Sequence, residues 1–113
     1  MLTCPTSSET EDAYNEWYND KHLVEVARLE GVVRASRYKF AHEVALRPGT
    51  PAPTQRYLAI YELAGRTIPE LRAFADSLVQ ALDDGRVSID PSLDVDNMIS
   101  MVATPFGASV SAD

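Results

Sequence analysis

Alternating side chains predict the strands of this chain. Residues Gln55–Leu63 form the clearest run, with apolar side chains at both odd and even positions, so this strand is expected to be covered on both faces. Residues Val32–Phe40 alternate with a mixture of polar and apolar side chains on each face. Shorter apolar runs at Met1–Cys4 and within Asp96–Thr104 are expected to supply a first and a last strand, the first being short for a strand.

A helix is predicted to begin near Glu9 and to end before Gly31, a residue that suits a helix stop. Ser8 and Glu11 have the spacing of a capping box, in which each side chain satisfies an open backbone N–H. Apolar residues keep a helical spacing after His22 as well. Whether the helix runs unbroken through residues 20–22 is left open by this pattern.

A second helix is predicted to start after Thr67, which caps it, with Glu70 completing a capping box. Asp83, Asp84 and Gly85 end it. Apolar residues recur every three or four positions, so they share one face and are expected to be buried against the sheet. This stripe consists of Ile68, Leu71, Phe74, Ala75, Leu78, Val79 and Leu82.

The resulting order, β-α-β-β-α-β, is typical of the ferredoxin-like α+β fold, a four-stranded antiparallel sheet with both helices on one face. Residues 1–113 are therefore expected to form one domain, with the proline-rich loop Arg47–Pro53 between two strands and a loose tail from about residue 107. The second face of the sheet needs a cover. A second copy of the chain is the simplest one, so a homodimer is predicted.

Composition narrows the choice of partners. The net charge is −7, which disfavours nucleic acids and anionic membranes because both attract basic surfaces. No apolar run approaches the roughly 20 residues of a membrane span, and no signal peptide is evident. The one cysteine, Cys4, cannot form an intrachain disulfide and fits a reducing cytoplasm. No metal-binding motif is present, so no metal site is expected.

Residues 14–22 concentrate the side chains that are suited to chemistry. His22 is the leading candidate for acid/base catalysis because the unperturbed pKa of histidine lies near neutrality; a surface or capping histidine is the alternative. Tyr18 precedes it by four residues and is the second catalytic candidate. Tyr14 and Trp17 are candidates for substrate binding, with packing in the core or at a dimer contact as the alternative.

The strands add further candidates for substrate binding, namely Tyr38, Tyr57, Tyr61 and Arg37. Arg37 can hold an anionic group or pair with a nearby carboxylate. Asp90 and Asp94 are expected to be solvated loop acids, His42 to be exposed and Cys4 to be a small buried residue. No cofactor is expected; haem stays an alternative, with His22 as the one plausible axial ligand.

Three segments give the chain a family resemblance. They are Glu11–Leu23, Gly31–Tyr38 and Arg56–Leu63, and the first contains the pattern W-Y-x-x-x-H-L. A weaker similarity is present at Ile89–Asp94. On these motifs the chain resembles the EthD-like branch of the dimeric α+β barrel superfamily. It departs from the common form at Val24, where proline often stands, and its first strand is shorter.

The resemblance implies a homodimeric barrel with a pocket between the sheet and the helices of each subunit. Its members include cofactor-free oxygenases, cyclases, isomerases, dehydratases and haem enzymes, so the fold alone does not select a reaction. We expect a cofactor-free lyase, isomerase or cyclase acting on a small, largely apolar carbonyl or phenolic compound. The alternatives are a cofactor-free monooxygenase of an electron-rich phenol and a non-catalytic protein that binds a small apolar or aromatic ligand.

Overall fold

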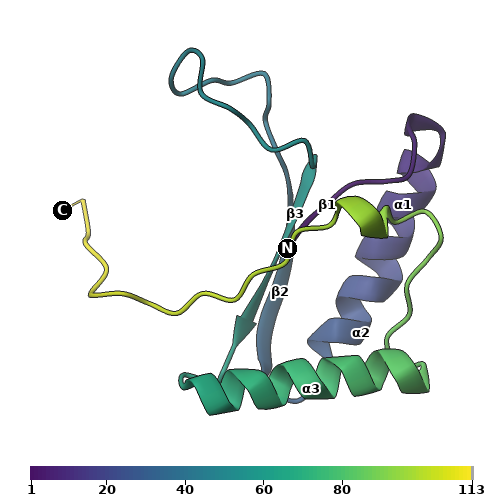
Figure 1. Cartoon of the computed structure of the whole chain (residues 1–113), viewed down its shortest axis with the longest axis vertical. Helices are drawn as coiled ribbons and strands as arrows, with labels where there is room; N and C mark the ends of the chain where they lie inside the picture. The colour runs from purple at the N-terminus through teal and green to yellow at the C-terminus, as the bar shows by residue number, and fades with distance from the viewer. Residues whose placement is uncertain (113) are drawn as a thin grey trace.

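A three-stranded antiparallel sheet and two long helical segments make up the computed structural model, which describes residues 1–112 (Figure 1). The mixed α+β prediction is confirmed at this level. The first helical segment runs beside the sheet, and the second crosses one end of it (Figure 1). No helix among the described residues is long and apolar enough to cross a membrane. The strands, in the spatial order β1-β3-β2, are β1 (Leu2–Thr3), β2 (Val32–Lys39) and β3 (Tyr57–Leu63).

The register of β3 decides which side chains face the helices. Ala59 lies opposite Arg37 and Tyr61 lies opposite Ala35, so these positions share one face of the pleated sheet. Tyr57 and Ala59 on this face are buried beneath the first helical segment. On the other face Ile60 is exposed, and Arg34 pairs with Glu62.

The first helical segment is continuous and contains a π-helical turn. Its initiation differs from the prediction, because Ser7 and Thr10, not Ser8 and Glu11, form the capping box. Thr10 is the residue three positions into the turn, so its hydroxyl reaches the backbone N–H of Ser7. The segment consists of η1 (Ser8–Thr10), α1 (Glu11–Trp17), the π-helical turn η2 (Tyr18–His22) and α2 (Leu23–Ala27).

The second helix, α3 (Ile68–Asp84), begins as predicted, with Thr67 and Glu70 forming the capping box. It ends at Gly85, whose φ of 85° is the left-handed conformation that glycine adopts readily. The predicted core stripe is wrong in part. Phe74 and Leu78 are half-buried, and the stripe members Ile68, Val79 and Leu82 are exposed, because α3 crosses only one end of a small sheet.

The predicted fourth strand is not formed over its length. Residues Val95–Asn97 make the short 3₁₀ turn η3, and only Ile99 bridges to Leu2, with backbone N···O distances of 2.8 and 3.0 Å. Beyond this bridge, residues 100–104 pair with no strand of the described chain. From Met101 onwards the described residues are exposed.

Two apolar clusters form the core on the helix side of the sheet. The first lies beneath residues 14–22, which we call the aromatic segment, and is described with the site below. The second lies where α2, α3 and the sheet meet, and is built around Val26, Leu29, Ala81 and Val87. Together they fix the first helical segment against β3.

Candidate active site

The aromatic segment presents its functional side chains toward the sheet. Tyr14, Tyr18 and His22, four residues apart, are all buried. An α-helix turns once in about 3.6 residues, so positions four apart drift around its axis. The wider π-helical turn at Tyr18–His22, closed by the bond from the Leu23 N–H to the Tyr18 carbonyl, reduces this drift. Such turns occur frequently at functional sites.

His22 lies between two aromatic rings and is only 5% exposed. Its ring centroid is 4.7 Å from that of Trp17 and 4.9 Å from that of Tyr18. The Nδ1 atom lies 2.9 Å from the backbone carbonyl oxygen of Ser88. A carbonyl can only accept, so Nδ1 carries the proton and, in the neutral ring, Nε2 carries a lone pair. Burial lowers the pKa of His22 below its ordinary value of 6.5, so the ring is neutral at pH 7.

Arg37 reaches from β2 into the aromatic cluster. Its guanidinium carbon lies 4.2 Å from the ring centroid of Tyr18, 5.0 Å from that of Tyr57 and 5.3 Å from that of Tyr14, which is cation–π geometry. Its terminal nitrogens donate to the side-chain oxygens of two asparagines of the first helical segment. These are Asn19, at 2.8 Å, and Asn15, at 3.0 Å.

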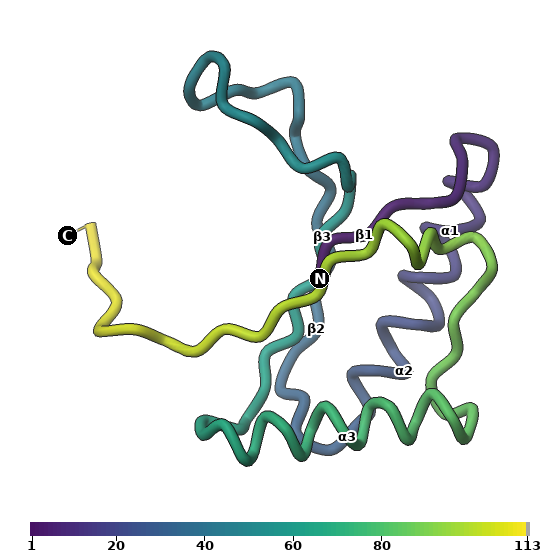
Figure 2. The backbone as a smooth tube through the Cα atoms, in the orientation of Figure 1, coloured from purple at the N-terminus to yellow at the C-terminus, as the bar shows by residue number. Residues whose placement is uncertain are grey.

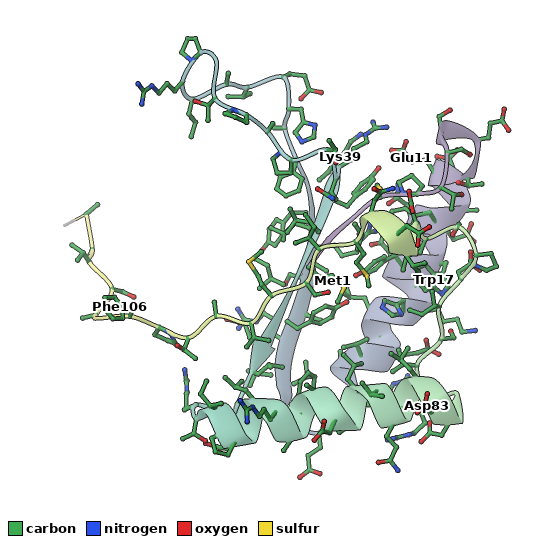
Figure 3. All side chains as sticks on the ribbon, viewed as in Figure 1. Met1, Glu11, Trp17, Lys39, Asp83 and Phe106 are labelled. Atoms are coloured by element: carbon green, nitrogen blue, oxygen red, sulfur yellow. The ribbon has the colours of Figure 1, made fainter. Side chains whose placement is uncertain are left out.

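A chain of polar contacts continues from Asn15 to the exposed end of the sheet. The Asn15 amide donates to the Tyr57 hydroxyl at 2.9 Å, and that hydroxyl donates to Glu11. Glu11 also pairs with Arg56 at 2.9 Å. Glu11 lies at the upper end of the helical segment in Figure 3. Tyr57 is therefore held from both sides, and its role here is to fix the helix to β3.

Tyr18 and Tyr61 meet hydroxyl to hydroxyl at 3.2 Å. Burial raises the pKa of both phenols, so each is a neutral hydrogen-bond donor at pH 7. Tyr18 also approaches the Met1 sulfur at 3.9 Å. Arg37 favours the ionised form of both phenols and opposes the effect of burial. An anionic oxygen placed at this pair would therefore find hydroxyl donors and a nearby positive charge.

Two of the hollows in the described part of the chain lie beside this cluster. The larger, which we call the β3–α3 groove, has a volume of about 840 Å³ and is lined by Tyr61, Leu71, Phe74, Leu78 and Met101 among others. A shallow hollow of about 380 Å³ is lined by Asn15, Asn19, Arg37, Tyr38, Lys39 and Tyr57. Tyr61 lines the groove and also bonds to Tyr18, whereas His22 lines neither hollow.

The structure brings together all but one of the predicted site residues. Tyr38 is the exception: it is 53% exposed and takes no part in the aromatic cluster, although it lines the shallow hollow beside Arg37 and Tyr57. His42 is exposed, as expected, and stacks on Phe40. Cys4 is half-buried, not fully buried. The clustered residues are Tyr14, Trp17, Tyr18, His22, Arg37, Tyr57 and Tyr61.

Sequence reasoning missed the residues that hold the cluster in place. The sequence does mark Asn15 and Asn19, because they are four residues apart on the first helical segment. Side chains at this spacing can bind the same partner, here Arg37. Ser88 has none, because its contact with His22 joins residues 66 positions apart. Thr3, whose hydroxyl bonds to that of Tyr14, lies 11 positions before it, in a different element.

No three histidine, cysteine or carboxylate side chains within residues 1–112 gather in a way that could hold a metal ion. For haem, the expected ligand is His22. Because the Trp17 and Tyr18 rings pack against its imidazole, haem can reach Nε2 only if these rings move.

Comparison of the chain with protein-family models, with curated proteins and with solved structures finds no match. The resemblance to EthD-like proteins therefore stays a prediction that rests on the sequence motifs alone.

Proposed function

We propose that this chain is a small-molecule enzyme without a cofactor that moves protons on a small, largely apolar carbonyl or phenolic compound, as a lyase, isomerase or cyclase. The observation that carries the proposal is the place of Tyr61. This residue lines the apolar β3–α3 groove, and its hydroxyl bonds to Tyr18 close to the Arg37 guanidinium. An apolar hollow with a few convergent polar groups is typical of small-molecule sites.

In this proposal the groove binds the apolar body of the ligand against Leu71, Phe74 and Leu78. The hydroxyl of Tyr61 donates a hydrogen bond to the ligand oxygen. As negative charge develops on this oxygen in an enolate or phenolate, Tyr61 and the charge of Arg37 stabilise it. Tyr18 donates to or accepts from Tyr61 at 3.2 Å and orients that hydroxyl.

His22 is the proposed base. Its Nδ1–H is fixed on the Ser88 carbonyl, and its neutral ring leaves Nε2 able to accept a proton. Because His22 lines neither hollow and is covered by the Trp17 and Tyr18 rings, a ligand reaches Nε2 only when these rings move. Glu25, which accepts hydrogen bonds from the backbone N–H and hydroxyl of Ser88, favours the charged imidazolium that the proton transfer would form. Trp17 and Tyr18 pack against this base, and Tyr14 packs against both of their rings.

A second candidate function is supported by the position of His22. This residue lines neither hollow, an arrangement that also suits a protein that binds a small apolar ligand without converting it. The same groove and the same Tyr61 contact would then serve recognition alone.

For the assembly, we propose a homodimer of ferredoxin-like subunits. The bridge between Leu2 and Ile99 supports it, because the fourth strand of a ferredoxin-like sheet would extend from this position beside β1. The exposed Ile60 and Tyr38 on the outer sheet face support it as well, since a second copy would cover them.

Hydrogen–deuterium exchange on any ketone that binds the protein tests the enzyme proposal. Small ketones and phenols are first screened for a rise in melting temperature. Ketones that bind are then incubated in D₂O with the protein, and loss of the proton beside the carbonyl is followed by NMR. The wild type should accelerate this exchange, and Tyr61→Phe should slow it by about 10²–10³-fold, since one oxyanion donor is removed.

Tyr38→Phe is the matched control, because Tyr38 lies outside the groove, and it should exchange like the wild type. Binding without accelerated exchange would refute the enzyme and leave the binding protein. Oxygen consumption with a bound phenol would identify the monooxygenase instead.

A further inference from the structure

Within residues 1–112, one edge of β3 is unpaired beyond Ala59. Ala59 exchanges backbone hydrogen bonds with Met1, at 2.8 Å each, and β1 pairs only with Tyr57 and Leu58. Alternate residues of a strand direct their N–H and C=O groups to opposite edges. Tyr61 and Leu63 therefore direct theirs to the same edge as Ala59, where the described chain places no further strand.

This open edge borders the β3–α3 groove. Phe74 and Leu78 of α3 form one apolar wall, and the start of the C-terminal segment, including Met101 and Val102, lies on the other side. Figure 2 shows the C-terminal segment leaving the body beside Met1 and diverging from β3. An unpaired strand edge next to an apolar groove is the setting in which an extended segment adds to a sheet.

The chain carries a segment with the features that this edge requires. Residues 106–112, which we call the distal arm, alternate strictly: Phe106, Ala108, Val110 and Ala112 are apolar, and small or polar residues stand between them. Period-two alternation is the pattern of a strand, and the distal arm has no proline to interrupt a ladder. The distal arm has no charged residue either, although the net charge of the whole chain is −7. It can therefore enter an apolar groove without desolvating a charge.

The distal arm forms no strand in the described chain. Phe106 and Val110 are fully exposed, and Phe106 projects from a segment that stands well away from the body (Figure 3). The distal arm extends away from the groove of its own copy. It is therefore placed to reach the groove of a second copy.

We infer that the distal arm of one copy adds as a strand to the open edge of β3 in a second copy, and that the exchange is reciprocal. Backbone bonds to Tyr61 and Leu63 hold the arm, and its apolar side chains close the groove opposite Phe74 and Leu78, whose surface stays available to the ligand. Two copies related by a two-fold axis satisfy both edges, so the assembly closes as a dimer. The exchanged arm then covers the groove beside Tyr61, so each site is completed by the partner.

Amide hydrogen exchange in the full chain tests this arrangement. In the wild type at dimer-forming concentrations, the amides of Tyr61 and Leu63 should be protected, and dilution should remove the protection. The double variant Phe106→Asp/Val110→Asp should lose the protection and raise the dimer dissociation constant by at least about 10²-fold, because the added carboxylates would have to be desolvated.

The matched control is Val44→Asp/Leu46→Asp, which places the same charges at exposed apolar positions of the β2–β3 loop and should retain both properties. Freely exchanging Tyr61 and Leu63 amides in the wild type, or a monomer at all concentrations, would overturn the inference. Protection or dimerisation that survives in the arm variant would also overturn it, because another segment would then hold the edge. These readouts do not depend on catalysis. The inference rests on the homodimer proposed above, and a dimer that persists in the arm variant would refute the arm exchange while leaving that homodimer in place.

Discussion

Replacing Tyr14 by alanine should lower the free energy of unfolding by about 3–5 kcal/mol, as expected for removal of a fully buried aromatic side chain. Tyr14 is 0% exposed and its ring contacts those of Trp17, Tyr18 and Tyr57. Its loss opens a cavity under the Arg37 guanidinium, which packs on the same ring. Chemical denaturation measured by circular dichroism gives the value.

Tyr14→Phe separates the ring from the hydroxyl. It keeps the packing and removes the hydroxyl, which bonds to Thr3 and interacts with Arg37, so the loss should be about 1 kcal/mol. Leu46→Ala, at an exposed position of the β2–β3 loop, should change stability by less than about 0.5 kcal/mol. A loss below about 1 kcal/mol for Tyr14→Ala would show that the aromatic cluster is not the core of this fold.

His22→Gln should lower turnover by about 10²–10⁴-fold while the protein stays folded and still binds its ligand. Glutamine keeps polarity and approximate size but cannot accept and return a proton near neutral pH. The rate of deuterium exchange on a bound ketone measures this, per folded molecule. Unchanged exchange in a folded His22→Gln protein would remove His22 from the mechanism and leave the tyrosines as the acid/base candidates.

The same substitution has a pH-dependent effect on stability. Burial lowers the pKa of His22 in the folded state. Below pH 6.5, His22 therefore becomes protonated in the unfolded chain while it stays neutral in the folded chain. The contribution of neutral His22 is therefore fully present above pH 6.5 and is lost as the pH falls from 6.5 toward the folded-state pKa. Comparison of wild type and His22→Gln by denaturation at pH 7.5 and pH 5.5 should show this loss in the wild type only.

The helical starts and the central strand could be predicted because their signals are local. Thr67 and Glu70 lie three residues apart and cap each other within one turn. The alternation in Gln55–Leu63 predicts a strand covered on both faces, and β3 forms within it, although Ile60 is exposed in the single chain. The aromatic face was also predictable, because the spacing of Tyr14, Tyr18 and His22 already places them on one side of a helix.

The features that the sequence did not reveal depend on contacts between distant segments. The stripe on α3 predicts burial, but a spacing cannot say how much partner surface exists, and Ile68 and Val79 find none in the single chain. The predicted fourth strand is likewise reduced, within the described residues, to the bridge between Leu2 and Ile99. The Ser88 carbonyl that fixes the His22 tautomer comes from beyond the end of α3, and no local pattern marks it.

The protonation state of His22 is the most direct test of the proposed base. Nitrogen NMR of the imidazole across pH 4–8 reports which ring nitrogen carries the proton and at what pH the second is added. The account predicts a neutral ring at pH 7 with the proton on Nδ1, as its contact with Ser88 requires, and a pKa below 6.5. A ring that titrates freely at 6.5, or that carries its proton on Nε2 at pH 7, would contradict it.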